Sequence, residues 1–305
     1  MNILFTGGTG LIGSAFIQRF AKQHTFTVLT RQPNKAVRIL GSKVTTISRL
    51  DTLKNLDKFD AVINLAGEPI ADKRWSASRK ARLEQSRWNI TSEVATLINR
   101  SSNPPAVFIS GSAVGYYGRQ GALPITENEN SFTIHSEYSH ELCRVWEETA
   151  RISEHNTRLC IVRTGIVLAP KGGALARMVP PFTLGLGGPI GSGEQMMSWI
   201  HLDDMVNLLA YLLEHEQCRG NYNATAPNPV NNHEFSRTIA HVLRRPCMFK
   251  VPAFALRAVF GDMADLILTG QAALPARLQK EGFKFQYPTL EPALINVLKN
   301  DHKKS

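Results

Sequence analysis

The feature that most constrains the fold is a glycine-rich turn directly after the first predicted strand. A short β-rich run over residues 2–6 leads into Thr6-Gly7-Gly8-Thr9-Gly10-Leu11-Ile12-Gly13. Glycines spaced in this way permit a tight turn, let the backbone approach a pyrophosphate and let a helix pack closely on the strand. The helix N-terminus then offers free N–H groups to an anion. The alternative is a glycine-rich turn without a ligand, but strand, turn and helix follow in the order that a dinucleotide site requires.

The residues expected to contact the dinucleotide share this turn and the helix that follows it. They are Gly7, Thr9, Gly10, Leu11, Ile12 and Gly13.

Short β-rich runs alternate with helical patterns through the first half of the chain. Strands are predicted over residues 2–6, 26–30, 43–47, 61–65, 106–110 and 158–163. The clearest helix is predicted over residues 76–100, where Leu83, Ile90 and Val94 fall on one apolar stripe. This alternation is typical of an α/β fold with a parallel sheet covered on both faces. We therefore predict a Rossmann-type doubly wound sheet.

The pattern changes after residue 165, and we expect a second, smaller unit there. Residues 1–165 would form the dinucleotide-binding domain, with part of residues 195–225 returning to it. Residues 166–305 would form a smaller α+β substrate lobe with a helical C-terminal extension. Residues 170–193 are rich in glycine and proline and are expected to form a loop over the ligand edge of the sheet.

Composition indicates an ordinary globular protein with an anionic partner. Apolar residues make up 43% of the 305 residues, and the net charge is +10. The basic residues are scattered, and no zinc-finger or RNA-binding signature accompanies them, so nucleic acid is not the expected partner. The four cysteines are far apart and the histidines are dispersed, so no metal site is expected. No apolar run reaches the roughly 20 residues of a membrane helix, and no signal peptide is recognised. We expect a cytoplasmic protein with no membrane partner.

The end of the second predicted strand indicates which dinucleotide binds. An NAD-binding chain places Asp or Glu there to bind the ribose 2′-hydroxyl, whereas this chain has Thr30-Arg31, followed by Lys35 and Arg38. A guanidinium suits a 2′-phosphate in both shape and charge. The alternative is a solvated surface arginine. We predict NADP(H) as the cofactor, with Arg31 on its 2′-phosphate.

Several further motifs together resemble the extended short-chain dehydrogenase/reductase superfamily, and more closely its epimerase-like atypical branch, the YfcH-type proteins. Besides the glycine-rich turn, the resemblance is carried by Asn64-Leu65-Ala66-Gly67-Glu68-Pro69-Ile70, Ser86-Arg87-Trp88-Asn89, Ser110-Gly111-Ser112-Ala113-Val114-Gly115-Tyr116-Tyr117-Gly118, Leu168-Ala169-Pro170, Leu184–Gly193, Trp199-Ile200-His201-Leu202-Asp203-Asp204 and Gln271–Phe283. It covers nearly the whole chain. It implies an NADP-binding core, a small-molecule substrate held by the C-terminal lobe, and a homodimer as one possible assembly.

The resemblance also implies where the site residues lie. Leu65, Ala66, Gly67 and Glu68 would line the cofactor at the end of the fourth predicted strand. Ser112 matches the catalytic Ser/Thr of the superfamily, and Asn89 falls near an Asn that supports the active-site network in many relatives. The structural alternatives are a turn-capping hydroxyl for Ser112 and a helix-surface amide for Asn89.

The catalytic Tyr-x-x-x-Lys pair of the superfamily is incomplete in this chain. Counting from Tyr138 puts Leu142 in the place of the Lys, and a register shifted by one gives Ser139 and Cys143. An unassisted tyrosine has a pKa near 10, so only about one in a thousand is ionised at pH 7, which is roughly 4 kcal/mol of missing activation. Tyr138 is a candidate acid/base, Tyr116 and Tyr117 are alternative phenols, and simple aromatic packing is the structural reading for these rings.

Arg163 ends the sixth predicted strand, at the edge where ligands bind in such folds. It could contact a phosphate or substrate carboxylate, or form a structural ion pair. The sequence thus predicts an NADP(H)-dependent oxidoreductase or epimerase-like enzyme, with Ser112, Tyr138 and Asn89 as catalytic candidates. The alternative is a non-catalytic NADP(H) sensor, which the missing Lys favours.

Overall fold

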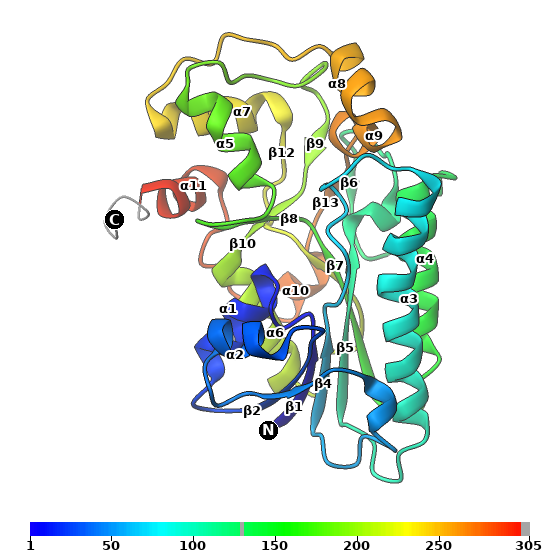
Figure 1. Cartoon of the computed structure of the whole chain (residues 1–305). Coiled ribbons are helices and arrows are strands. Elements are labelled where there is room, and N and C mark those ends of the chain that lie inside the picture. Colours follow the sequence, from blue (N-terminus) through cyan, green and yellow to red (C-terminus); the bar gives the residue numbers. More distant parts are fainter. Residues whose placement is uncertain (129–130, 300–305) are drawn as a thin grey trace.

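Seven strands form the main sheet (Figure 1). The protein is described by a computed structural model that covers residues 1–128 and 131–299. The strands are β1 (Asn2–Thr6), β2 (Thr25–Leu29), β3 (Thr45–Ile47), β4 (Ala61–Asn64), β5 (Val107–Ala113), β7 (Arg158–Thr164) and β11 (Gly220–Ala224). Their order across the sheet is β11-β7-β5-β4-β1-β2-β3, and every neighbouring pair is parallel. From the interior strand β1 the chain runs first toward one edge, through β2 and β3, and then from β4 toward the other edge. The predicted doubly wound Rossmann-type fold is thus confirmed.

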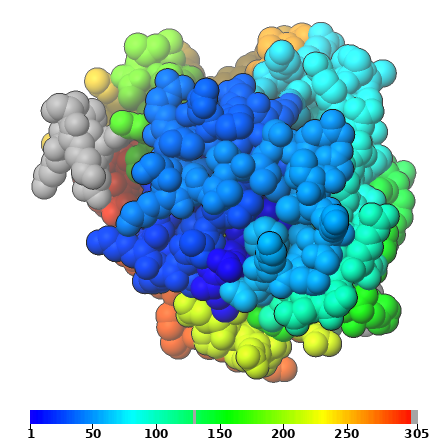
Figure 2. All heavy atoms as spheres, turned by 60° about the horizontal axis from the view of Figure 1, so that its bottom comes forward, coloured from blue at the N-terminus to red at the C-terminus, as the bar shows by residue number. Residues whose placement is uncertain are grey.

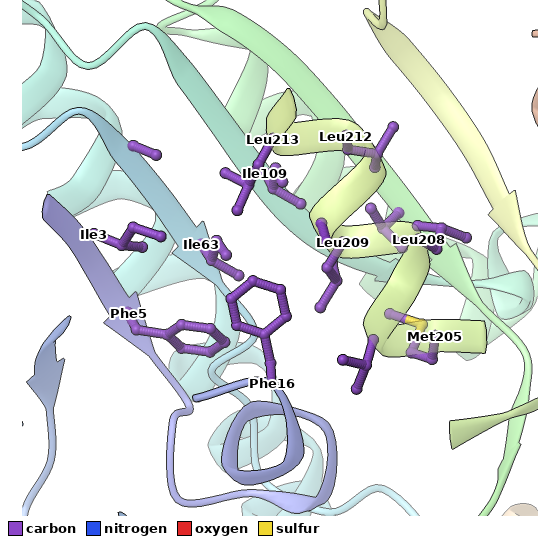
Figure 3. Packing of buried hydrophobic residues seen from close by; sticks show 14 of the residues in the cluster. Ile3, Phe5, Phe16, Ile63, Ile109, Met205, Leu208, Leu209, Leu212 and Leu213 are labelled. Carbon is purple, nitrogen blue, oxygen red and sulfur yellow. The ribbon is translucent and has the colours of Figure 1, made fainter. Parts of the chain in front are cut away.

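Helices cover both faces of this sheet. The helices packed on it are α1 (Leu11–Phe20), α2 (Pro33–Leu40), α3 (Ala77–Asn99), α4 (Tyr138–Arg151) and α6 (Leu202–Glu214). Alternate residues of β1 point to opposite faces: Ile3 and Phe5 pack with α1 and α6, whereas Leu4 packs with α3. Figure 3 shows the first of these layers, in which Phe16 of α1 and Leu209 of α6 meet the strand residues.

Six of the seven strands occur where the sequence predicts them, with ends that differ by a few residues, whereas β11 was not predicted as a strand. β1 begins and ends as predicted, whereas β5 continues three residues beyond the predicted end at 110, to Ala113. All four residues of β4 are buried, as expected for a parallel strand covered on both faces. Helix α3 has the predicted extent because the Ser76 side chain caps its N-terminus by accepting a hydrogen bond from the backbone N–H of Arg79.

Most of the remaining elements form a second packed unit beside the carboxyl ends of the strands (Figure 1). Its helices are α5 (Leu175–Thr183), α7 (Asn232–Leu243), α8 (Ala253–Phe260), α9 (Asp265–Leu268) and α11 (Leu290–Lys299), whereas α10 (Ala276–Lys280) packs against β11 and adds Leu278 to the core of the main sheet. Its short strands pair as β8 (Ile166–Leu168) with β10 (Trp199–His201), β9 (Met196–Met197) with β12 (Val230–Asn231), and β6 (Pro124–Ile125) with β13 (Ala272–Ala273). A separate apolar cluster, including Trp199 and Phe235, lies between α5, α7 and α11.

The loop expected over residues 170–193 contains a helix, which corrects the prediction. Helix α5 includes Pro180 and Pro181, which remove backbone donors and argue against a helix in the sequence. The helix forms because Leu175 and Phe182 are buried in the second apolar cluster. Tertiary packing therefore overrides the local signal.

No helix in the described part of the chain is long and apolar enough to cross a membrane.

Candidate functional site

The glycine-rich turn forms a tight link between β1 and α1. Gly7 has φ +73°, and a Cβ atom there would lie 2.5 Å from the carbonyl oxygen of Leu65. A Cβ atom at Gly13 would lie 2.5 Å from the carbonyl oxygen of Gly7. Helix α1 begins without a side-chain cap, and its first turn carries no acidic residue. Only glycine fits these two positions, and the helix start remains available to an anion.

A cavity of about 1060 Å³ lies beside this turn. Its walls come from the turn itself, from the segments that follow β2, β3 and β4, and from α3. Figure 2 brings the bottom of the view in Figure 1 forward, and the N-terminal segments (blue) occupy the centre of that face. Because the strands are parallel, their carboxyl ends meet at one edge, which is where ligands bind in open α/β sheets. Most of the predicted cofactor residues line the cavity: Gly7, Thr9, Gly10, Arg31, Leu65, Ala66, Gly67 and Glu68.

The other three predicted turn residues lie behind the wall of the cavity. Leu11 faces the glycines that follow β8, since a Cβ atom at Gly173 would lie 3.2 Å from its side chain. Ile12 packs against the first apolar cluster, and Gly13 packs against the turn. The packing of these three residues shapes the turn. Their backbone amides belong to the first turn of α1, which has no side-chain cap.

Arg31 and Glu68 form a long ion pair in the wall of the cavity. Arg31 follows β2, its side chain is 89% exposed, and its Nη2 lies 3.8 Å from Glu68 Oε1. Glu68 is held more firmly by the buried Arg79, whose Nη1 donates to Glu68 Oε2 at 2.7 Å. The hydrogen bond from Arg79 lowers the pKa of the Glu68 carboxyl. Glu68 is therefore engaged with Arg79, and Arg31 remains an accessible cation at the rim.

Ser112 belongs to a buried polar network at the carboxyl ends of β5 and β7. Its Oγ donates to Glu147 Oε1 at 2.7 Å, and Arg163 donates to both oxygens of Glu147, at 2.8 Å each. Arg163 also donates to the hydroxyl of Tyr117 at 3.0 Å, and its guanidinium lies 3.6 Å from the centre of the Tyr116 ring. Burial raises the pKa of Tyr117 to about 12. The two charges of the network, on Arg163 and Glu147, are paired with each other.

This network corrects the assignment of Arg163 to the cofactor. Arg163 is fully buried and does not line the cavity. Its guanidinium is occupied by Glu147 and Tyr117, so the structural ion pair is the reading that the structure supports.

Tyr138 has a different set of neighbours. It begins α4 and its hydroxyl donates to the backbone oxygen of Lys80 at 3.1 Å, at the start of α3. Its ring lies 4.9 Å from that of Trp75, and Lys80 Nζ lies 5.0 Å from the ring centre. Burial raises the pKa of Tyr138 well above its usual value, which opposes the ionisation that an acid/base needs. Asn89 lies on α3 in the cavity wall. Ser112, Tyr138 and Asn89 thus contact three different sets of residues.

One functional-looking residue, Glu147, was not singled out from the sequence. Glu147 joins Ser112 to Arg163 through hydrogen bonds. It lies one helical turn after Cys143. Burial raises the pKa of the Cys143 thiol to about 11. Arg87 donates to the backbone oxygen of Glu68 at 2.9 Å, and a Cβ atom at Gly67 would lie 2.9 Å from its guanidinium carbon. The i, i+4 spacing of Cys143 and Glu147 indicates one helix face, but the sequence contains no signal for their distant partners.

Comparison with known proteins identifies the family. Residues 3–225 match the NAD dependent epimerase/dehydratase family, and residues 251–297 match a domain of unknown function named DUF1731. The chain belongs to the NAD-dependent epimerase/dehydratase family. The resemblance to the extended short-chain dehydrogenases is thereby confirmed, and the chain is an epimerase-like member of a group that binds NAD(P).

Relatives from several organisms cover almost the whole chain. The epimerase family protein SDR39U1 homolog of Arabidopsis thaliana, described as chloroplastic, is 41% identical over 98% of this chain and 87% of its own length. Human SDR39U1 is 34% identical over 98% of this chain and 100% of its own length. A crystal structure of human SDR39U1 isoform 2 with NADPH matches with a TM-score of 0.88 and 35% identity, and the match covers 98% of this chain and 100% of that chain.

More distant structures share the fold alone. UDP-glucose 4-epimerase of Thermotoga maritima matches with a TM-score of 0.76 at 18% identity, over 99% of each chain.

Among the described residues, no group of three or more His, Cys, Asp or Glu side chains could hold a metal ion.

Proposed function

We propose that this chain binds NADP(H) in the cavity and acts as an NADP(H)-dependent oxidoreductase or epimerase-like enzyme on a small polar substrate. The observation that carries the proposal is Arg31. It stands at the cavity rim directly after β2, where a carboxylate would select NAD, and its nearest carboxylate oxygen is 3.8 Å away. The exposed guanidinium of Arg31 could bind a 2′-phosphate there, because it is not buried in an ion pair with another residue. The relative crystallised with NADPH supports the same cofactor.

The rest of the cavity fits a dinucleotide. The uncapped start of α1 would bind the pyrophosphate, and Gly7 and Gly13 let the backbone pack closely enough to form that cradle. Lys35, in the first turn of α2, also lines the cavity and adds positive charge near Arg31. A bound nicotinamide would supply or accept a hydride.

Ser112 would bind the reacting oxygen of the substrate. Its own proton is donated to Glu147, so its free lone pairs can accept a hydrogen bond from a substrate hydroxyl. Arg163 holds the Glu147 side chain in place through two hydrogen bonds, which fixes the direction of that proton. In this arrangement Ser112 orients a substrate and does not itself transfer a proton.

A non-catalytic NADP(H) sensor is the second candidate. The position of Tyr138 favours it, because the hydroxyl is bound to Lys80 and the phenol has a raised pKa. No Lys follows four residues later, where Leu142 stands. A sensor would retain the cofactor cavity and have no need of a proton shuttle.

Calorimetry with cofactor-stripped protein tests the cofactor assignment. We expect Arg31→Asp to weaken NADPH binding by about 10- to 100-fold, the value of one or two charged hydrogen bonds, and to leave NADH binding nearly unchanged. Arg38→Asp is the matched control, since it makes the same charge change on α2 outside the cavity wall. Equal losses for both cofactors, or no heat from the wild-type protein with either form of NADP, would contradict the assignment.

Turnover separates the enzyme from the sensor. Wild-type protein with bound NADPH is incubated with a broad panel of carbonyl compounds, and NADPH oxidation is followed by absorbance. Oxidation that Ser112→Ala reduces supports the enzyme. NADPH binding without oxidation by any compound in the panel supports the sensor.

We also propose that the functional division lies near residue 165. Residues 1–165 and part of 195–225 would hold the cofactor, and the rest of 166–305 would hold the substrate. Support comes from β11, which adds to the main sheet beside β7, and from the separate apolar cluster around α5, α7 and α11.

A further inference from the structure

We propose that an apolar, basic edge of the C-terminal lobe docks this protein on an anionic lipid bilayer. We call this edge the apolar ridge. It consists of Leu184, Leu186, Met248, Phe249 and Phe254, with the basic residues Arg244, Arg245 and Lys250 among them. The proposal does not depend on the proposed function.

Two segments about sixty residues apart in the sequence form the ridge. The segment after α5 runs beside the segment that joins α7 to α8, along the top of the view in Figure 1. Val251 N donates to the backbone oxygen of Pro189, and Gly191 N donates to that of Val251, both at 2.9 Å. At Gly188 a Cβ atom would overlap the carbonyl oxygen of Phe249. These contacts fix the apolar side chains of both segments on one edge.

The apolar side chains of the ridge project into solvent. Met248 is 81% exposed, Phe254 is 77% exposed and Leu184 is 74% exposed. Helix α8, with the sequence AFALRAVF, buries none of its residues. A helix that is apolar nearly all round normally lies in a protein core or against lipid. Apolar side chains gathered on one edge indicate an interaction site.

The charge of the ridge identifies the partner. Residues 235–261 contain five Lys and Arg residues and no Asp or Glu, and residues 155–193 also contain no Asp or Glu. Among the ion pairs of the described residues, none involves Arg244, Arg245 or Lys250. Like charges disfavour a second copy of the chain on this edge. An anionic surface is complementary to it.

The shape favours lipid over an acidic protein. Protein–protein interfaces bury apolar residues between surfaces of complementary shape, whereas the ridge presents exposed side chains on two turns and a helix. A bilayer needs no matching relief, because side chains insert between headgroups while Lys and Arg bind the phosphates. A surface formed by two distant segments leaves no long apolar run in the sequence, so the sequence alone predicts no membrane partner.

Sedimentation with vesicles tests the proposal. The full-length protein is mixed with vesicles of phosphatidylcholine that contain roughly a third phosphatidylglycerol, and with vesicles of phosphatidylcholine alone. We expect binding to the anionic vesicles to be at least about ten-fold stronger, because each Lys or Arg near the surface adds to the attraction. Absence of binding to the anionic vesicles would overturn the proposal, and so would equal binding to both.

Three variants identify the surface that binds. Met248→Ser with Phe249→Ser and Phe254→Ser removes apolar contact, and Arg245→Glu with Lys250→Glu reverses the charge. Each should lower the partition coefficient at least about ten-fold. Leu123→Ser with Ile134→Ser is the control, since both side chains are more than 60% exposed but lie outside the ridge. Loss in the charge variant alone would indicate general electrostatic adsorption and would overturn the proposal. Thermal unfolding of each variant verifies that it is folded.

Discussion

Arg31 and Arg163 are both cations at the carboxyl ends of parallel strands, yet their surroundings are opposite. Arg31 is almost fully exposed at the cavity rim and lies 3.8 Å from its nearest carboxylate oxygen. Arg163 is fully buried and forms two hydrogen bonds with Glu147. An exposed cation retains its capacity to bind a ligand, whereas a buried cation must be paired before any ligand arrives. Burial therefore separates a cation that can still bind a ligand from one that is already committed to a structural ion pair.

The largest expected effect comes from breaking the buried pair. Glu147→Gln leaves Arg163 without a counter-charge in the interior, and we expect a loss of roughly 3–5 kcal/mol in the free energy of unfolding. Chemical denaturation measures it. Arg144→Ala is the control, because its pairs with Glu141 and Glu148 are on the surface and are worth at most about 1 kcal/mol. Similar losses of unfolding free energy in the two variants would show that the buried ion pair stabilises the fold no more than the surface pairs do.

Crowding of the glycine-rich turn should have the next largest effect. Gly13→Ala places a Cβ atom 2.5 Å from the carbonyl oxygen of Gly7. We expect a loss of roughly 1–3 kcal/mol in stability and a marked loss of NADPH binding, because the helix must move away from the turn. Ser14→Ala, one residue later in the same helix, should change binding little. Wild-type affinity in Gly13→Ala would show that close packing of α1 is not needed for the site.

The buried thiol of Cys143 predicts a pH dependence. Burial raises the folded-state pKa of this thiol to about 11, above its usual value of 9.0. The unfolded chain therefore loses this proton first, so the stabilising contribution is complete below pH 9 and is lost as the pH rises toward 11. The wild-type protein should lose about 1.4 kcal/mol more than Cys143→Ala between pH 8 and pH 10 in urea titrations. Parallel curves for the two proteins would exclude this titration.

The smallest effect is expected at Tyr138. Tyr138→Phe removes one hydrogen bond to the backbone of Lys80 and should cost about 0.5–1.5 kcal/mol in stability. If NADPH oxidation is found, its kcat should be unchanged. A drop of more than about 100-fold in kcat, with normal NADPH binding, would restore Tyr138 as the general acid or base.

Much of the cofactor region could be predicted because its signals are local. The turn from Gly7 to Gly13 requires residues without side chains at fixed spacings, and the predicted strands end where the cavity begins. The polar network could not be predicted in the same way. Ser112, Glu147 and Arg163 come from two strands and a helix, and no periodic pattern links positions 35 residues apart. Helix α5 was missed because Pro180 and Pro181 oppose a helix locally, and burial of Phe182 offsets them.

The amino-acid sequence by itself determined the alternation of strands and helices in the first half of the chain, the glycine-rich turn and the cation after β2. These features depend on backbone preferences and apolar periodicity within a few residues. Only the tertiary structure decided that Arg163 is paired with Glu147, that the hydroxyl of Tyr138 is bound to Lys80, and that two distant segments form the apolar ridge. The physical reason is that the role of a polar or apolar side chain depends on which partners and how much water surround it after folding.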